Sequence, residues 1–337
     1  MNELEATARA LVAPGKGILA ADESTGSIKK RLDAVAVEST PETRRAYREL
    51  LFTTPGMEEF ISGVIMFDET IRQATIDGVP FPRLLTDRGV IPGIKVDAGA
   101  KPLALASGET ITEGLDGLRD RLAGYRDLGA RFTKWRAVIE IGQGIPSNYA
   151  IWTNAHALAR FAALSQEAGL VPIVEPEVLM DGNHTIERAG HVTSLTLLAV
   201  FTELHDQRVR LEGMLLKPNM VLAGYDAPVQ ASPDEVADAT LACFRRTVPV
   251  AVPGIVFLSG GQSEQQATAN LNAINGRQPH PWQISFSYGR ALQATALTAW
   301  AGEPANVINA QRAFHLRAKL NGAARAGRYT PEMESVA

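Results

Sequence analysis

Residues 213–261 contain the pattern that decides the fold: GMLLKPN (213–219) and GIVFLSGG (254–261) flank the helix-like segment SPDEVADATLACFRRT (232–247). The two flanking runs are short and apolar and are bounded by glycine or proline, as buried strands are. The segment between them begins with Ser-Pro and two acidic residues, which favours a helix N-terminus. A strand, a helix and a second strand in this order predict one unit of a parallel sheet.

The same unit repeats along the chain. Six further runs resemble the two above: GILAAD (17–22), GVIMFD (63–68), PGIKVD (92–97), RFTKWRAV (131–138), VPIVEPE (171–177) and QISFSYG (283–289). Helix-like segments lie between them, for example PETRRAYRELLFTT (41–54) and NAHALARFAALSQEAG (154–169). Eight such units predict an α/β fold that closes into a (β/α)8 TIM barrel. The alternative is a doubly wound sheet, but the first run leads into AADESTGS (20–27) and not into the GxGxxG turn of that fold.

Composition limits the classes of protein that remain. The chain has 337 residues, is 45% hydrophobic and carries a net charge of −4, which is typical of a globular protein and disfavours nucleic acid or a membrane as the main partner. A single cysteine, Cys243, and an N-terminus without an apolar leader favour the cytoplasm. No linker divides the chain, so we expect one domain over residues 1–337. Its barrel core would cover about 17–302, with helical extensions at both ends.

Charged or glycine-rich residues follow at the C-terminal ends of all eight runs, where TIM barrels build their active sites. One charged residue that leaves a strand is ordinarily a solvent contact, whereas eight converging ends predict a site. In chain order the ends carry Asp22, Asp68, Lys95, Lys134 with Arg136, Glu175 with Glu177, Lys217, Ser259-Gly260-Gly261 and Ser287-Tyr288-Gly289-Arg290.

The last two of these ends predict an anion site. Loops after the seventh and eighth strands often bind phosphate in this fold. Ser259-Gly260-Gly261 lets backbone N–H groups approach an anion closely, and Arg290 can bind phosphate through two N–H groups. The SGG triplet alone is also common in ordinary turns, and YGR in the neighbouring loop strengthens the prediction.

Lys217 follows the apolar run GMLL, so we expect it in a poorly solvated barrel mouth. Burial and a nearby cation such as Lys134 lower the pKa of a lysine, and a neutral amine forms Schiff bases with ketones. Glu175 and Glu177 are two apart in a strand and share a face, where one can transfer protons. A solvated lysine and an ion-pair network that only braces the barrel are the alternatives.

Histidine placement argues against a metal site. None of the six histidines, at positions 156, 184, 191, 205, 280 and 315, ends a strand in this interpretation, and we expect them at the surface or in helix caps. Catalytic divalent-metal sites usually combine histidine with carboxylate ligands. We therefore expect neither a metal nor another cofactor.

Seven motifs, taken in order, resemble class I fructose-1,6-bisphosphate aldolase. They are ILAADESTGSIKKRL (18–32), GIKVD (93–97), KWR (134–136), IVEPE (173–177), LLKPNM (215–220), FLSGGQS (257–263) and SFSYGRAL (285–292). The resemblance covers roughly residues 10 to 330 and implies a TIM barrel, a homotetramer and no metal. It also implies reversible cleavage of fructose 1,6-bisphosphate to dihydroxyacetone phosphate and glyceraldehyde 3-phosphate through a lysine Schiff base.

The resemblance further implies roles for individual residues. Lys217 resembles the Schiff-base lysine, and Glu175 the acid that helps to dehydrate the carbinolamine. Glu177 resembles a neighbour that tunes the local charge, and Lys134 the lysine that stabilises charge beside the imine. Asp22 resembles the carboxylate that binds a substrate hydroxyl and takes part in carbon–carbon cleavage.

The remaining matched residues resemble substrate-binding groups. They are Ser259, Gly260, Gly261, Ser287, Gly289 and Arg290 for the ketone-side phosphate, Ser24, Ser27, Arg31 and Lys95 for the second phosphate, and Arg136. One departure concerns proton transfer. The animal enzymes end in a tyrosine that assists it, whereas this sequence ends RYTPEMESVA (328–337), which leaves open the group that reprotonates the enamine.

Two other functions remain open at this point. One is a Schiff-base aldolase for a different phosphorylated sugar. The other is a non-catalytic barrel that binds phosphosugars, which we would expect to have lost Lys217, Glu175 or Asp22; all three are present.

Overall fold

The computed structural model describes residues 2–335. The barrel strands are β1 (Gly17–Ala21), β2 (Ile61–Met66), β3 (Ile91–Lys95), β6 (Phe132–Ile139), β7 (Val171–Val178), β8 (Leu215–Leu216), β9 (Gly254–Phe257) and β10 (Gln283–Tyr288). They pair in parallel in the order β1-β10-β9-β8-β7-β6-β3-β2, and β2 pairs with β1 to close the ring. The predicted (β/α)8 barrel is confirmed.

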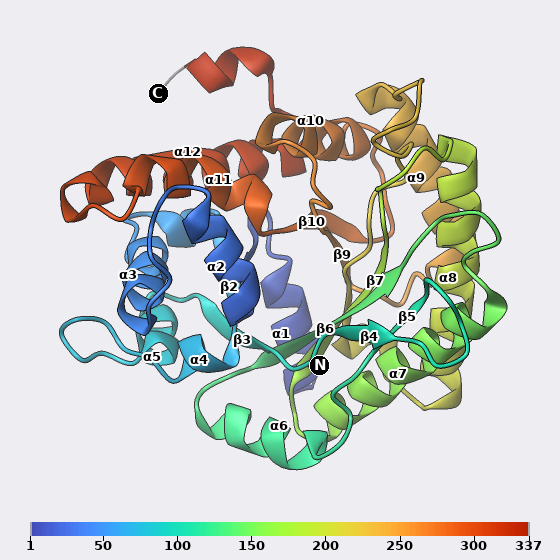
Figure 1. The fold of residues 1–337 in the computed structure, drawn as a ribbon, viewed down its shortest axis with the longest axis horizontal. Helices are drawn as coiled ribbons and strands as arrows, with labels where there is room; N and C mark the ends of the chain where they lie inside the picture. The colour runs from blue at the N-terminus through green and yellow to red at the C-terminus, as the bar shows by residue number, and fades with distance from the viewer. Residues whose placement is uncertain (1, 336–337) are drawn as a thin grey trace.

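Helices surround this barrel, and the first of them lies across its end (Figure 1). They are α1 (Glu3–Leu11), α2 (Thr25–Asp33), α3 (Pro41–Phe52), α4 (Asp68–Ile71), α5 (Phe81–Asp87), α6 (Leu118–Asp127), α7 (Asn148–Glu167), α8 (Ile186–Asp206), α9 (Pro233–Thr247), α10 (Glu264–Asn275), α11 (Arg290–Trp300) and α12 (Val307–Arg325). Within residues 2–335, none has the length and hydropathy that crossing a bilayer requires.

Helix starts follow the capping signals in the sequence. Ser232 caps α9 in a capping box with Glu235, and Ser263 caps α10. Helix α7 begins at Asn148, six residues before the predicted segment, because the Ser147 hydroxyl accepts a hydrogen bond from the N–H of Ala150 and caps the helix there. A small hairpin, β4 (Ala100–Pro102) with β5 (Thr110–Thr112), has no counterpart in the sequence prediction.

Two predicted strands are shorter in the structure. The run 213–219 contains only the two-residue strand β8, because residues 211–213 form a 3-10 turn and Pro218 has no N–H to donate. The run 254–261 ends as a strand at Phe257, and Gly260 and Gly261 adopt φ angles of +58° and +94°. Such positive φ angles end a strand and favour glycine.

Side chains that point into the barrel change from apolar to charged along the neighbouring strands β6 and β7. Phe132 in β6 and Ile173 in β7 lie in the apolar interior, and two residues later the same face carries Lys134 and Glu175. The interior is tightly filled, since a Cβ atom at Gly93 in β3 would lie 2.2 Å from the Phe132 ring. The charged groups therefore gather above an apolar floor, at the C-terminal end of the barrel.

Helix α1 closes the opposite end. Leu11 and Val12 are buried in the same cluster as the inward-facing Phe132 and Leu215, and α1 lies at the centre of the ring in Figure 1. The Arg325 guanidinium, at the end of α12, donates hydrogen bonds to the carbonyl oxygens of residues 12, 13 and 16. The N-terminal and C-terminal extensions are thus joined at the base of the barrel.

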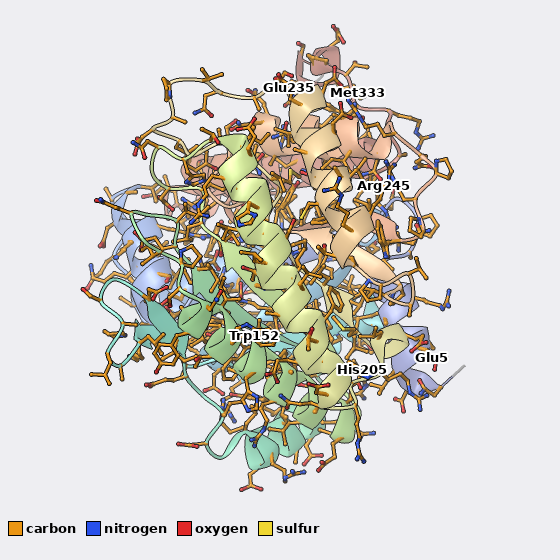
Figure 2. The ribbon with its side chains drawn as sticks, turned by 90° about the vertical axis from the view of Figure 1, so that its right-hand side faces the viewer. Glu5, Trp152, His205, Glu235, Arg245 and Met333 are labelled. Atoms are coloured by element: carbon orange, nitrogen blue, oxygen red, sulfur yellow. The ribbon has the colours of Figure 1, made fainter. Side chains whose placement is uncertain are left out.

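The second core lies between the strands and the outer helices. Trp135 of β6 points outward and stacks on Phe161 of α7, with ring centroids 5.7 Å apart. Helices α7, α8 and α9 follow one another around this side of the barrel, and Figure 2 shows α8 and α9 side by side on the outer surface. This packing holds β6, β7 and β8 in place, and these strands carry most of the charged groups described next.

Candidate active site

A cavity of about 600 Å³ opens at the C-terminal end of the barrel. Every predicted site residue except Gly261 lines it: Asp22, Ser24, Ser27, Arg31, Lys95, Lys134, Arg136, Glu175, Glu177, Lys217, Ser259, Gly260, Ser287, Gly289 and Arg290. Residues far apart in the sequence thus meet at one site, as the strand-end pattern predicts.

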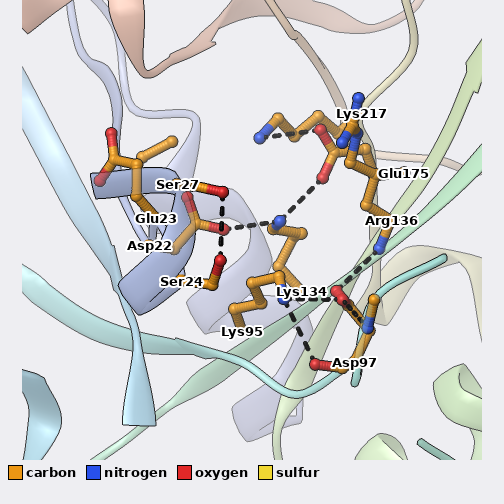
Figure 3. A network of polar contacts seen from close by, with 12 residues as sticks. Asp22, Glu23, Ser24, Ser27, Lys95, Asp97, Lys134, Arg136, Glu175 and Lys217 are labelled. Atoms are coloured by element: carbon orange, nitrogen blue, oxygen red, sulfur yellow. Dashed lines mark hydrogen bonds and ion pairs between the residues drawn. The ribbon is translucent and has the colours of Figure 1, made fainter. Parts of the chain in front are cut away.

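A chain of ion pairs crosses this cavity (Figure 3). The Lys217 Nζ atom lies 3.1 Å from Glu175 Oε1, and the Lys134 Nζ atom lies 3.1 Å from Glu175 Oε2. Lys134 Nζ also lies 2.6 Å from Asp22 Oδ2. Lys134, Glu175 and Lys217 are each 3% exposed, so water screens these contacts little.

Neighbouring opposite charges determine the protonation states of these ion-paired side chains. Burial alone would raise the pKa of both Asp22 and Glu175, but Lys134 and Lys217 outweigh it and hold both pKa values below their ordinary range. Burial would likewise lower the pKa of Lys134, but Asp22 and Glu175 raise it above its ordinary value. At neutral pH, Lys134 is therefore a cation between two carboxylates.

A second set of charges lies beside the first. Lys95 Nζ is 2.7 Å from Asp97 Oδ1, and Asp97 Oδ2 accepts a hydrogen bond from the backbone N–H of Arg136. The Arg136 guanidinium donates to Glu177. Burial would lower the pKa of Arg136, but Glu177 outweighs burial and raises it. Glu177 is thus paired with an arginine, whereas Glu175 contacts two lysines.

The loops after β9 and β10 form one wall of the cavity. The Ser287 hydroxyl is buried and has no hydrogen-bond partner within residues 2–335. Arg290 begins α11, directly after Gly289, so this helix N-terminus also faces the cavity. Gly261 is not among the lining residues but borders them, since a Cβ atom there would be 3.3 Å from Nη2 of Arg290, which lines the cavity. Helix N-termini and arginine both favour anions.

A second group of anion-binding side chains comes from the first loop. Ser24 occupies the N-cap position of α2 without a side-chain capping hydrogen bond, and its hydroxyl lies 3.1 Å from that of Ser27. Arg31 lines the cavity, but its guanidinium is paired with Glu23, which also accepts a hydrogen bond from Arg48. Arg31 is therefore less free to meet a phosphate than the sequence suggests.

Comparison with known proteins agrees with this geometry. The profile of the family described as fructose-bisphosphate aldolase class-I matches residues 3–337. The chain is 58% identical over 330 residues to a protein of Xylella fastidiosa (strain 9a5c) named probable fructose-bisphosphate aldolase class 1, with 98% of this chain and 99% of that one covered. It is 54% identical to the non-muscle type fructose-bisphosphate aldolase of Lethenteron camtschaticum, with coverages of 98% and 91%.

A solved structure gives the same result. The fold matches fructose-bisphosphate aldolase from Plasmodium falciparum, crystallised with TRAP and a small-molecule inhibitor, with a TM-score of 0.96 and 50% identity over 97% of this chain and 95% of that one. The chain belongs to the class I fructose-bisphosphate aldolases. Its reaction is the reversible aldol cleavage of fructose 1,6-bisphosphate, which this class carries out through a lysine Schiff base and without a metal cofactor.

Two further residues at the predicted strand ends do not line the cavity. Asp68 does not line the cavity, because β2 already ends at Met66 and Asp68 begins α4. Its carboxylate instead accepts hydrogen bonds from Arg72 and from the hydroxyl of Tyr125, each at 2.9 Å. Tyr288 points outward and donates to the carbonyl of Ala267.

Other cavity residues were missed. Glu23, Lys30 and Asp97 line the aldolase cavity, although none was predicted as a site residue. The sequence held a signal for two of them, because Glu23 follows Asp22 and Asp97 ends the run 92–97. The expectation that all six histidines are surface or capping residues is wrong for His184, which is buried in the loop after β7. Within residues 2–335, no group of three or more His, Cys, Asp or Glu side chains could hold a metal ion.

The lowered pKa of Asp22 predicts a change in acid stability. In the unfolded chain, Asp22 takes up a proton as the pH falls through its ordinary pKa of about 4, whereas in the folded protein it stays ionised to lower pH. The free energy of unfolding therefore falls as the pH drops below about 4. The variant Asp22→Asn cannot take up this proton. The slope of the free energy of unfolding against pH, measured by urea denaturation between about pH 3 and 5, should fall by up to about 1.4 kcal/mol per pH unit. An unchanged slope would contradict the lowered pKa.

Proposed function

We propose that Lys217 is the nucleophile of this aldolase and that Glu175 transfers protons to and from the reacting atoms. One observation carries the proposal: the two oxygens of a single buried carboxylate contact two lysine amino groups, each at 3.1 Å. Glu175 is therefore within proton-transfer distance of Lys217. Lys134, whose charge Asp22 and Glu175 hold in place, cannot replace Lys217 as the nucleophile, because it stays protonated.

The reaction follows from these positions. The Glu175 carboxylate accepts a proton from the Lys217 ammonium 3.1 Å away, and the freed amine adds to the substrate ketone. Glu175 then returns this proton to the hydroxyl that leaves as water. The resulting protonated imine accepts the electron pair of the breaking carbon–carbon bond. Asp22 binds the substrate hydroxyl, and the proton of that hydroxyl passes to the Glu175 carboxylate. Lys134 stabilises negative charge beside the imine, so no metal ion has to accept that charge.

Anion-binding groups on two sides of Lys217 support a bisphosphate substrate. Ser259, Ser287 and Arg290 lie on the β9 and β10 side of the cavity, and Ser24 and Lys95 lie on the β1 and β3 side. Phosphates at both ends of a six-carbon sugar would be bound simultaneously, and the bond to be cleaved would be held near the lysine. A sugar with one phosphate would leave one group unused, which disfavours the alternative substrate.

A covalent adduct tests the nucleophile. Incubation with dihydroxyacetone phosphate and borohydride should reduce the imine to a stable secondary amine on Lys217, because an amine has to lose its proton before it forms an imine, and Lys134 keeps its proton. Peptide mapping by mass spectrometry locates the adduct, and cleavage of fructose 1,6-bisphosphate is assayed with and without a chelator. An adduct on Lys134, or activity lost with the chelator, would refute the assignment.

Replacement of Glu175 separates proton transfer from binding. Glu175→Gln keeps the volume but cannot carry a proton, so turnover should fall roughly 10²- to 10⁴-fold, and borohydride trapping should slow in parallel. Glu177→Gln is the matched control, because Glu177 lies two residues further on the same face and pairs with Arg136. If borohydride traps the imine of Glu175→Gln at the wild-type rate, another residue performs the acid–base role, and Glu177 is the first candidate.

We also propose that the protein is a cytoplasmic homo-oligomer, a tetramer by resemblance to the family, and that the chain folds as one domain. The named cytosolic relative from Arabidopsis thaliana, 55% identical, supports the location. Packing of α1 and α12 against the barrel supports the single domain. Exposed Trp152 on α7, labelled in Figure 2, and exposed Leu195 and Leu198 on the neighbouring α8 provide an apolar surface for subunit contact.

Sedimentation velocity tests this assembly. Wild-type protein should sediment as an oligomer, and Trp152→Glu should shift it towards smaller species if this apolar surface is the contact, since a buried charge opposes association. A wild-type protein that sediments as a monomer at micromolar concentration would exclude the oligomer.

A further inference from the structure

Tyr225 lies in the loop after β8, next to the phosphate side of the cavity, and none of the site motifs contains it. Its phenol donates a hydrogen bond of 3.0 Å to the carbonyl oxygen of Gly260. The same hydroxyl lies 3.4 Å from the Met180 sulfur. Tyr225 thus connects the loop after β8 with the loops after β9 and β7, although the sequence separates these loops widely.

The backbone around Tyr225 is fixed by the loop after β7. The N–H groups of Gly224, Tyr225 and Asp226 donate to carbonyl oxygens at positions 184, 180 and 182, at 2.8 to 2.9 Å. The two loops are in close contact, since a Cβ atom at Gly224 would lie 2.2 Å from the Gly182 carbonyl oxygen. Three consecutive hydrogen bonds leave the Tyr225 backbone little freedom, so its ring is presented to Gly260 from a rigid support.

The geometry of a peptide bond links the Gly260 carbonyl to the Gly261 N–H. These two groups belong to one planar trans peptide and point in opposite directions, so fixing the carbonyl also fixes the N–H. Both glycines have positive φ angles, and glycine adopts positive and negative φ angles about equally readily. Without an external contact, this peptide would be free to turn its N–H away from the cavity.

Arg290 and Tyr225 approach Gly261 from the same side. A Cβ atom on Gly261 would lie 3.3 Å from Arg290 Nη2, 3.4 Å from the Tyr225 ring and 3.6 Å from its hydroxyl. Burial raises the pKa of Tyr225 to about 12, although the positive charge of Arg290 acts to lower it. The phenol is therefore protonated at neutral pH and acts as a hydrogen-bond donor to the Gly260 carbonyl.

We propose that Tyr225 is a positioning residue for the phosphate-binding loop: by holding the Gly260 carbonyl, it directs the Gly261 N–H towards the ketone-side phosphate of the substrate. The proposal rests on the assignment of Ser259, Ser287 and Arg290 to that phosphate. Tyr225 does not touch the reacting carbons in this scheme. Its effect is therefore on phosphate affinity and not on the chemistry at Lys217.

The variant Tyr225→Phe removes the hydroxyl and keeps the ring. We expect the KM for fructose 1,6-bisphosphate and the concentration of dihydroxyacetone phosphate for half-maximal borohydride trapping to rise roughly two- to tenfold, the effect of one neutral hydrogen bond, with kcat little changed. Trapping with dihydroxyacetone, which carries no phosphate, should proceed as in the wild type. Tyr125→Phe is the matched control, because it removes a phenol that bonds to Asp68 outside the cavity.

The outcomes are distinguishable. An unchanged affinity for dihydroxyacetone phosphate in Tyr225→Phe would overturn the positioning role. So would an equal loss with dihydroxyacetone, since that result places the effect on the lysine or on the whole fold. If wild-type protein forms no adduct with dihydroxyacetone phosphate, the proposed function itself fails. If Arg290→Ala binds this ketone as the wild type does, the phosphate assignment beneath the proposal fails, while the Lys217 adduct remains.

Discussion

The structure depends on one buried cation, the ammonium of Lys134, held between Asp22 and Glu175. Asp22 follows β1 and Lys134 lies on β6, and these strands are not neighbours in the ring, so the contact spans the barrel mouth. An eight-stranded barrel has an interior just wide enough for side chains from opposite strands to meet. Loss of one partner from such a buried pair leaves an uncompensated charge, a cost of about 3–5 kcal/mol. The site is therefore complete only in the closed barrel, where both carboxylates reach Lys134.

The pairing of Lys134 with two carboxylates also determines which partners the other charged residues of the cavity have. The positive charges of two lysines offset the negative charges of two carboxylates, Asp22 and Glu175. This pairing allows four ionisable groups to lie close together where they have little contact with solvent. Glu175 is shared by Lys134 and Lys217, and so the group that fixes the charge of one lysine is also the group nearest to the other. Glu177, one pleat further towards solvent, is paired with Arg136 instead. Neighbouring carboxylates on one strand face thus have different partners and can perform different tasks.

Much of this site could be predicted from the sequence because strand periodicity is simple. Once the strand ends are located, alternation of side chains places Lys134 and Arg136, or Glu175 and Glu177, on the inner face, and closure brings them together. The pattern failed where the strand ended early, as at Asp68, whose carboxylate starts a helix. It could not reveal that Arg31 of α2 pairs with Glu23, because strand periodicity does not describe how the loop before α2 lies against this helix. Tyr225 was missed because its position depends on hydrogen bonds between two loops that are distant in the sequence.

The floor that α1 builds under the barrel makes the cavity a dead end. Leu11 and Val12 close the space between the strands from below, so the barrel offers no passage through to its other face. Everything that enters by the mouth has to leave by it, including both three-carbon fragments of one substrate. A product fragment that is still bound blocks entry of the next sugar. In the reverse direction, the fragment bound covalently to the lysine reacts with an aldehyde that enters through the same opening. Entry and release through one opening follow from the position of α1, a helix of nine residues at the opposite end of the barrel.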